Sequence, residues 1–238
     1  MLRSMFALAA ALAVSATAVR GEAYVAGYVG AARTRPAIIT LEQSDPAVRL
    51  TFEQVPLSGK SFESPIYYGY RAGYFFMRHL GIEAEFIHLK IHADLSQPVS
   101  IHGNVGEIAV RERAPMSRYA GQFEVSHGLN MVLVNAVARR AIIGQNDFVF
   151  LVRAGAGPTV PRPEVIVLGS AGGAYEIGPI AVQGAAGIEA RLWRGLHALA
   201  DYKYTFTPTS FHIPNGRAAL HVHSHHFVTG IAVHFGAD

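Results

Sequence analysis

A strict two-residue alternation between apolar or aromatic side chains and small or charged ones recurs along the chain and constrains its fold more than any other feature. In segment 65–76, Tyr68, Tyr70 and Tyr74 share one face, whereas Gly69 and Arg71 share the other. Successive side chains of a strand point to opposite faces, so this pattern predicts β-strands with one apolar face. Segments 147–160, 174–191, 196–207 and 219–235 show the same alternation.

The spacing of the alternating segments indicates how the strands are connected. We predict strands at 23–33, 65–76, 81–93, 125–138, 147–160, 174–191, 196–207 and 219–235. The connections 77–80, 139–146 and 192–195 are short, and 34–64, 94–124, 161–173 and 208–218 are long. Short turns that alternate with long loops are typical of an all-β, eight-stranded antiparallel up-and-down transmembrane β-barrel, with the short turns in the periplasm. A soluble lipocalin-like barrel is the alternative, but its outward face should be polar.

The N-terminal segment predicts export. Arg3 precedes an apolar run over residues 5–14, and residues 16–18 have the small-x-small pattern that a signal peptidase cleaves. That run is about half of the roughly 20 residues that a spanning helix needs. We therefore expect residues 1–18 to be a cleaved signal peptide and residues 19–238 to form one outer-membrane β-barrel domain.

Composition excludes several classes of protein. Half of the residues are hydrophobic, only 16% are charged, and the formal net charge is +3. Segment 1–18 holds one base, Arg3, and no acid, so its removal lowers that charge from +3 to +2. So weak a positive charge does not indicate a nucleic-acid binder. The absence of cysteine excludes a disulfide framework and a thiolate metal site. We expect a monomer in the outer membrane.

Charged side chains on the small-residue faces of the strands should point into the barrel. They are Arg71, Glu83, Glu85, Arg153, Glu189, Asp201 and Lys203. An eight-stranded barrel is just wide enough for side chains to fill it, so we expect these three bases and four acids to form an ion-paired plug. The alternative is that Glu85 or Asp201 carries out proton chemistry in a low-dielectric lumen.

Histidines gather at one end of the predicted barrel. With the N-terminus in the periplasm, the extracellular rim receives the end of the third strand, the start of the fourth and the start of the last. These segments carry His88, Lys90 and His92, then His127 and Asn130, then His221, His223, His225 and His226. Imidazoles at one level suit a divalent transition metal or an acid–base site. The alternative is a headgroup-level surface that changes charge with pH. His79, His197 and His234 should lie near the periplasmic end and join no such cluster.

The third strand conflicts with strict alternation. If Glu83 and Glu85 face the lumen, then His88, Lys90 and His92 turn outward. Either a bulge resets the register, or the strand has left the hydrocarbon by His88, because a spanning strand uses only about 9 to 11 residues. In the second case Lys90 and His92 would face outer-leaflet phosphates.

Several blocks of the chain resemble the outer-membrane β-barrel family that includes lipid A oxidase. The blocks are SFESPIYYGYRAGYF, GIEAEFIHLKIHAD, FEVSHGLNMVLVNAVAR, GAGPTVPRPE, YEIGPIAVQGAAG, DYKYTF and SHHFVTGIAVHF. The positions that match are Tyr68, Gly69, Arg71, Glu85, His88, Lys90, His127, Gly128, Asn130, Asn135, Pro161, Glu164, Asp201, Lys203, and His225 or His226. The resemblance implies oxygen-dependent oxidation of the proximal glucosamine of lipid A to aminogluconate, with outer-leaflet lipopolysaccharide as the partner.

Such an oxidation needs an electron acceptor. Side chains cannot accept the two electrons, and no dinucleotide or flavin fingerprint is present, so we expect dioxygen activated by iron or copper. The metal ligands would be two or three of His88, His127, His225 and His226, with Glu85 or Glu164 as a carboxylate ligand or base. The expected catalytic residues are Glu85, His88, His127 and Glu164, and the expected substrate-binding residues are Lys90, Arg71 and Asn130.

Two other functions stay open. A lipid A deacylase needs a serine and a histidine, which Ser126 with His127, or Ser224 with His225, would supply; neighbours in a strand point to opposite faces, however, so neither dipeptide can be the working pair. The remaining alternative is a passive barrel similar to OmpA, with a structural or surface-binding role.

Overall fold

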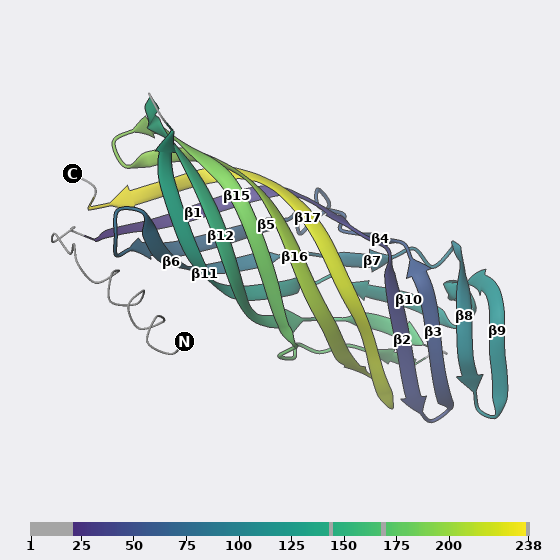
Figure 1. Cartoon of the computed structure of the whole chain (residues 1–238). Helices are drawn as coiled ribbons and strands as arrows, with labels where there is room; N and C mark the ends of the chain where they lie inside the picture. Colours follow the sequence, from purple (N-terminus) through teal and green to yellow (C-terminus); the bar gives the residue numbers. More distant parts are fainter. Residues whose placement is uncertain (1–20, 143–144, 168–169, 237–238) are drawn as a thin grey trace, which may run out of the picture.

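The computed structural model describes residues 21–142, 145–167 and 170–236 (Figure 1). The expected signal peptide, residues 1–18, lies outside these ranges. Within them, no helix is long and apolar enough to cross a membrane.

Eight strands of the described chain close into an antiparallel barrel (Figure 1). They are β1 (Glu22–Thr34), β5 (Tyr68–Phe75), β6 (Leu80–His88), β11 (Leu129–Ile142), β12 (Gln145–Pro161), β15 (Ile180–Trp193), β16 (Leu196–Ile213) and β17 (Gly216–Phe235). Each strand pairs with the next barrel strand along the chain, and β1 pairs with β17 from Ala23 opposite Phe235 to Thr34 opposite Ser224. The predicted all-β up-and-down barrel is confirmed.

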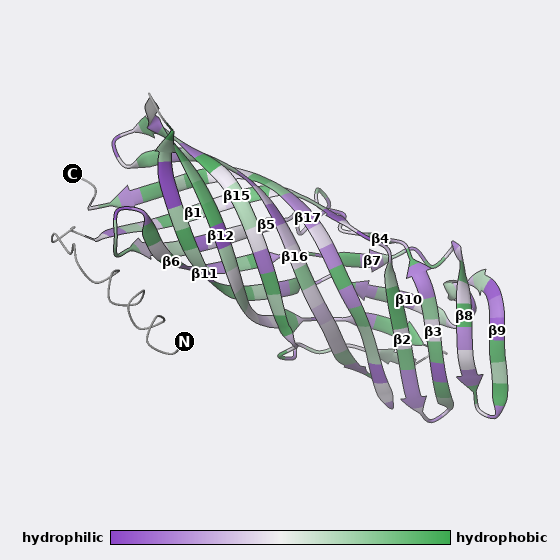
Figure 2. Ribbon diagram, in the orientation of Figure 1, coloured by the Kyte–Doolittle hydropathy of each residue, from purple (hydrophilic) through white to green (hydrophobic). Residues whose placement is uncertain are grey.

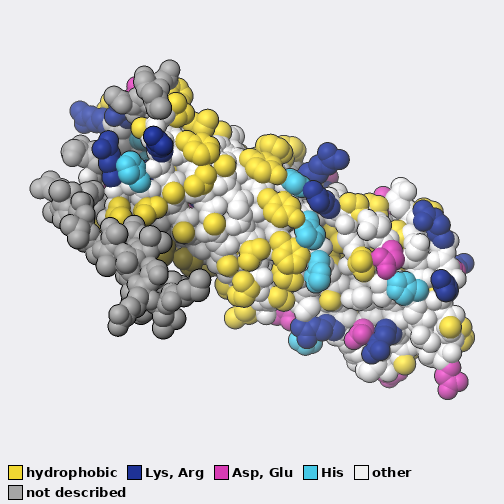
Figure 3. All heavy atoms as spheres, viewed as in Figure 1, with side chains coloured by type: hydrophobic (Ala, Val, Ile, Leu, Met, Phe, Trp, Pro, Cys, Tyr) yellow, Lys and Arg dark blue, Asp and Glu magenta, His cyan; other side chains and the backbone are white. Residues whose placement is uncertain are grey.

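The outward face of the barrel is an apolar belt. Hydrophobic and hydrophilic residues alternate along the barrel strands (Figure 2), and hydrophobic side chains gather over the barrel between two ends that carry the charges (Figure 3). Exposed members of the belt are Val25, Val29, Tyr70, Tyr74, Ile82, Val132, Val134, Phe150, Val152, Val182, Ile188, Tyr202, Phe227, Ile231 and Phe235. A soluble lipocalin-like barrel would expose polar side chains here. This face therefore meets hydrocarbon, as in outer-membrane barrels.

The long connections are strands, which corrects their expected assignment as loops. The hairpin of β16 and β17 covers 208–218 and extends beyond the rest of the barrel wall (Figure 1). Its far end pairs with β2 (Ala37–Ser44), and the sheet continues through β3 (Ala47–Val55), β8 (Pro98–Val105) and β9 (Ile108–Pro115). The joining register places Leu220 opposite Ile39, and both side chains are buried.

A second sheet packs against this extension. Its order is β14 (Ser170–Gly172), β13 (Glu164–Val167), β10 (Ala120–Val125), β7 (Ile91–Ala93) and β4 (Leu57–Ser58), and a short 3₁₀ helix, η1 (Met116–Arg118), precedes β10. The ring of Phe123 on β10 lies 5.9 Å from that of Phe211 on β16, and both are fully buried. The two sheets thus enclose a hydrophobic core at the end that we assign to the cell surface. We call this unit the extracellular domain.

The conflict in the third strand is resolved by its departure from the barrel. β6 ends at His88, and β7 begins at Ile91 in the other sheet. Residues 87–92 are all buried. The expected contact of Lys90 and His92 with outer-leaflet phosphates is therefore not formed. The Lys90 ammonium instead donates to the Glu63 carbonyl at 2.9 Å, and His92 Nδ1 lies 3.1 Å from the Glu124 carboxylate.

We predict that Ile39→Ala destabilises the extracellular domain by about 2–5 kcal/mol, because it opens a cavity between the two sheets. The neighbouring Ile38 is 47% exposed, whereas Ile39 is 0% exposed. Ile38→Ala is the matched control and should change stability by no more than about 0.5 kcal/mol. Limited proteolysis of the refolded protein should cut the domain of the Ile39 variant faster and leave the barrel intact. Equal cleavage of both variants would contradict the two-sheet core.

Candidate functional site

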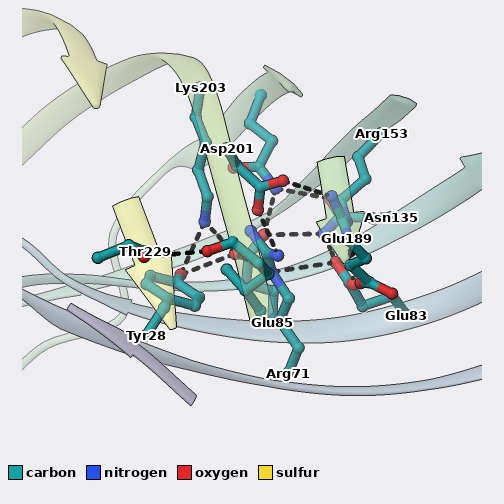
Figure 4. Close-up of polar contacts among 12 residues, drawn as sticks. Tyr28, Arg71, Glu83, Glu85, Asn135, Arg153, Glu189, Asp201, Lys203 and Thr229 are labelled. Atoms are coloured by element: carbon teal, nitrogen blue, oxygen red, sulfur yellow. Dashed lines mark hydrogen bonds and ion pairs between the residues drawn. The ribbon is translucent and has the colours of Figure 1, made fainter. Parts of the chain in front are cut away.

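The barrel lumen holds the charged plug that the alternation predicts (Figure 4). Arg71, Glu83, Glu85, Arg153, Glu189, Asp201 and Lys203 are all buried. The Arg71 guanidinium donates from Nε to Glu85 at 2.9 Å and from Nη1 to Asp201 at 2.6 Å. Arg153 donates to the other Asp201 oxygen at 3.2 Å and to Glu83 at 3.1 Å. Asp201 is thus shared between bases from two strands, Arg71 on β5 and Arg153 on β12.

Glu85 is the most heavily bonded member of the plug. Its carboxylate accepts from the Tyr28 hydroxyl at 2.7 Å and from Asn135 Nδ2 at 2.9 Å, and also from Lys203 and Gln183. These donors and Arg71 saturate both oxygens, so neither is free to accept a proton from a substrate. The side chains of Arg71 and Glu85 are 0% exposed. The expected base and the expected phosphate ligand therefore lie inside the plug, away from the rim.

A separate polar site lies on the outer side of the wall, where β6 ends and β11 begins. His88 Nδ1 lies 2.8 Å from the side-chain oxygen of Asn130, and the imidazole stacks on Tyr68 with ring centroids 4.9 Å apart. His88 Nε2 is buried without a hydrogen-bond partner. On the same outward face, Phe86 lies two residues before His88 and Val132 lies two residues after Asn130, and these two apolar residues pair with each other. The site thus lies just above the hydrocarbon.

The turn before β11 brings a second histidine to this site. Gly128 has φ +103°, and a side chain there would lie 2.6 Å from the His88 ring, so glycine is needed both for the backbone and for the close approach. Next to it, His127 Nδ1 lies 2.5 Å from the Glu164 carboxylate, and both side chains are part-exposed, at 48% and 35%. The structure therefore brings together four expected residues, His88, His127, Asn130 and Glu164. We call them the rim site.

The serine beside His127 is not placed as a nucleophile. Ser126 Oγ lies 3.4 Å from His127 Nδ1, the same nitrogen that meets Glu164. A serine–histidine–carboxylate relay needs the serine and the carboxylate on different imidazole nitrogens. On β17, Ser224 is fully buried toward the interior while His225 faces outward.

The histidines of β17 follow the strand alternation. His225 and His223 face outward, and their Nδ1 atoms meet the hydroxyls of Tyr202 at 2.7 Å and Tyr204 at 2.6 Å. His226 faces inward, is 0% exposed and lies 2.9 Å from the Thr205 hydroxyl through Nε2. Figure 3 shows histidines gathered between the apolar belt and the extracellular domain.

The four expected metal ligands do not converge. β11 and β17 are four strands apart in both directions around the eight-stranded barrel, so they lie on opposite sides of the wall. His88 and His127 therefore cannot share an ion with His225, and His226 points into the lumen. These four histidines therefore cannot hold one ion together.

A group within reach of a shared metal ion lies at the other end, in a place where no cluster is expected. In the described part of the chain, one group of three histidine or acidic residues has its ligand atoms within 4.8 Å of one another: Glu189, His197 and His234. His197 and His234 lie at the periplasmic end and away from the rim histidines, as expected, but with Glu189 they form a group of their own that was not predicted. Strand parity could have found this group, since His197 shares the face of Asp201 and Lys203.

Comparisons with known proteins bear on the fold. No protein-family model matches the chain, and no curated protein matches it in sequence. Its structure is similar to that of the outer membrane protein OprG from Pseudomonas aeruginosa, with a TM-score of 0.50, 12% identity and coverage of 92% of this chain and 97% of OprG. Neisserial surface protein A has a TM-score of 0.40, 14% identity and coverage of 89% and 96%. For Yersinia pestis Ail the TM-score is 0.38 and the identity is 11%, with coverage of 91% of this chain and 99% of Ail. The likeness to OprG supports the outer-membrane barrel fold alone.

We predict that Arg71→Ala lowers the free energy of unfolding by roughly 3–5 kcal/mol, because the substitution leaves Glu85 and Asp201 buried with fewer partners. Urea unfolding of the refolded barrel in detergent micelles measures this loss. Arg191 is the control, because its ion pair with Asp147 is about half exposed, and Arg191→Ala should cost no more than about 1 kcal/mol. Wild-type stability in the Arg71 variant would show that the plug does not hold the barrel together.

Proposed function

We propose that the protein modifies lipid A in the outer leaflet, and that the rim site carries out the chemistry. The observation that supports this most directly is the pairing of His127 with Glu164 on the outer side of the wall, just above the apolar belt. The diglucosamine backbone of lipid A lies at the level of the headgroups. A substrate embedded in the leaflet could therefore reach the rim site by lateral diffusion, without entering the packed lumen.

The pair is arranged as a general base. Glu164 lies 2.5 Å from His127 Nδ1. A carboxylate in this position would keep the proton on Nδ1, which would fix the imidazole tautomer and leave the lone pair of Nε2 free. The carboxylate also stabilises the imidazolium that forms when Nε2 takes a proton. His88 and Asn130 lie beside the pair and offer polar groups that would orient a sugar hydroxyl. Lys90 is buried against Glu63 and takes no part.

The resemblance to the lipid A oxidase family suggests which proton is removed. Oxidation of the C1 hemiacetal releases the hydroxyl proton to His127 and two electrons with the C1 hydrogen to an acceptor. With dioxygen as the acceptor, the products are a lactone and hydrogen peroxide, and hydrolysis of the lactone yields aminogluconate. The four histidines expected to hold iron or copper do not converge, so we assign no step to a metal.

The extracellular domain favours a second candidate function. It is built from β2, β3, β8, β9 and the second sheet around a hydrophobic core that continues into the barrel, and its polar end faces away from the belt (Figure 3). A barrel that carries such a domain is suited to binding a partner at the cell surface. In that function, lipid A would stay unchanged.

Mass spectrometry of lipid A from cells with and without the gene distinguishes these functions. We expect a gain in mass of one oxygen atom when the wild-type gene is present, and loss of that gain in His127→Ala and Glu164→Gln. His102→Ala is the matched control, because His102 also lies near a carboxylate, that of Glu53, at 3.9 Å, but on the extracellular domain. This control should retain the modification.

Other mass changes would identify the alternatives. Loss of an acyl chain would indicate a deacylase. An unchanged spectrum would leave surface binding by the extracellular domain as the function. Full modification by the His127→Ala variant would remove the rim site from the chemistry.

A further inference from the structure

The periplasmic end of the lumen carries a group of side chains that the proposed function does not use. Glu189 comes from β15, His197 from β16 and His234 from β17, so three consecutive strands of the wall contribute. We propose that these three residues bind a divalent transition metal ion of the zinc class. The site is independent of the rim site and lies at the opposite end of the barrel.

The distances suit a shared ion. His234 Nε2 lies 3.0 Å from Glu189 Oε2, and His197 Nδ1 lies 3.9 Å from the same oxygen. Ligands that each sit 2.0–2.1 Å from a tetrahedral zinc ion are separated by roughly 3.3 Å. The two observed separations lie on either side of this value. All three ligand atoms lie within 4.8 Å of one another, so the wider separations would close by up to about 1.5 Å when the ion binds.

The group has unused bonding capacity. His197 Nδ1 and Glu189 Oε1 are buried and have no hydrogen-bond partner. The Arg153 guanidinium forms an ion pair with Glu189 Oε1, but its Nη2 lies 3.7 Å away, beyond hydrogen-bond range. Buried polar atoms without partners are costly, and native proteins rarely leave them so. A cation held by His234 Nε2, Glu189 Oε2 and His197 Nδ1 would give the unpartnered His197 nitrogen a partner.

A carboxylate behind His234 holds the ring in a ligand orientation. His234 Nδ1 contacts Glu22, and Glu22 in turn accepts from Arg139 Nη1 at 2.8 Å. The imidazole also stacks on Tyr24, with centroids 5.2 Å apart. Metal-bound histidines commonly donate their second ring N–H to a carboxylate, which leaves the other nitrogen free for the ion. Here that other nitrogen, Nε2, is hydrogen-bonded to Glu189 Oε2 at 3.0 Å, so a bound ion would replace the proton between these two atoms.

The position of His197 gives the ion a way in. Its side chain is 14% exposed, whereas those of Glu189 and His234 are 3% exposed. It follows the periplasmic turn at 194–195 by two positions. An ion would therefore arrive from the periplasm and meet His197 first.

The bound ion would link the strands that close the barrel. It joins β15, β16 and β17 directly, and the contact of His234 with Glu22 extends the link to β1, which pairs with β17 along the seam. Binding to the folded state alone stabilises that state. The ion is therefore expected to raise the temperature of unfolding.

The test uses the full-length chain refolded in detergent micelles and titrated with Co²⁺ and Zn²⁺. We expect one Co²⁺ per barrel with the visible absorption of a four-coordinate site, displacement of Co²⁺ by Zn²⁺, and a higher Tm with either ion. His197→Ala should weaken binding by at least tenfold and abolish the absorption. Glu22→Gln should weaken binding by about 10–100-fold, as expected for the loss of the carboxylate behind a ligand.

His79→Ala is the matched control, because His79 lies on another periplasmic turn and outside the group. It should bind as the wild type does. Heat-shifted migration in gels reports whether each variant is folded, and His197→Gln replaces His197→Ala if the latter is not. Absence of stoichiometric binding to the wild type, or equal binding to a folded His197 variant, would overturn the site.

Discussion

The burial of paired charge in a narrow lumen is the constraint on which the rest of the structure depends. Charges excluded from water must meet partners of opposite sign, and these partners come from different strands. The pairing fixes register: Arg71 lies directly opposite Glu85, and Asp201 lies opposite Gly187. A side chain at Gly187 would lie 1.6 Å from the Asp201 carboxylate. Glycines beside the charged residues therefore make the room that the plug occupies.

The same alternation separates the plug from the rim site. Glu85 faces inward and is saturated by donors, whereas His88, at the end of the same strand, faces the outer side of the wall and bonds to Asn130. One strand thus carries both a saturated, buried carboxylate that stabilises the barrel and an outward-facing histidine that belongs to the rim site. Residues beyond His88 enter the second sheet, so the rim site lies at the junction between the barrel and the extracellular domain.

Local patterns were sufficient to predict the barrel and its lumen, because strand parity depends only on adjacent residues. They did not predict the extracellular domain, since its sheet rests on long-range pairing such as Leu220 with Ile39. The rim histidines share one height along the barrel axis, which suggested a common metal ion. Their positions around the axis matter as well, because the fourth and eighth strands of an eight-stranded barrel lie on opposite sides. His197 was assigned to the periplasmic end by its height alone, although its position in the strand alternation also places its side chain in the lumen.

The β16 and β17 hairpin runs without interruption from the periplasmic turn into the sheet of the extracellular domain. The barrel wall and the domain are therefore one hydrogen-bonded surface, with no linker along this hairpin to act as a hinge. A molecule bound by the domain would keep a fixed height above the bilayer and a fixed orientation relative to the barrel. Mechanical load on the domain would be transmitted directly into the membrane-embedded wall.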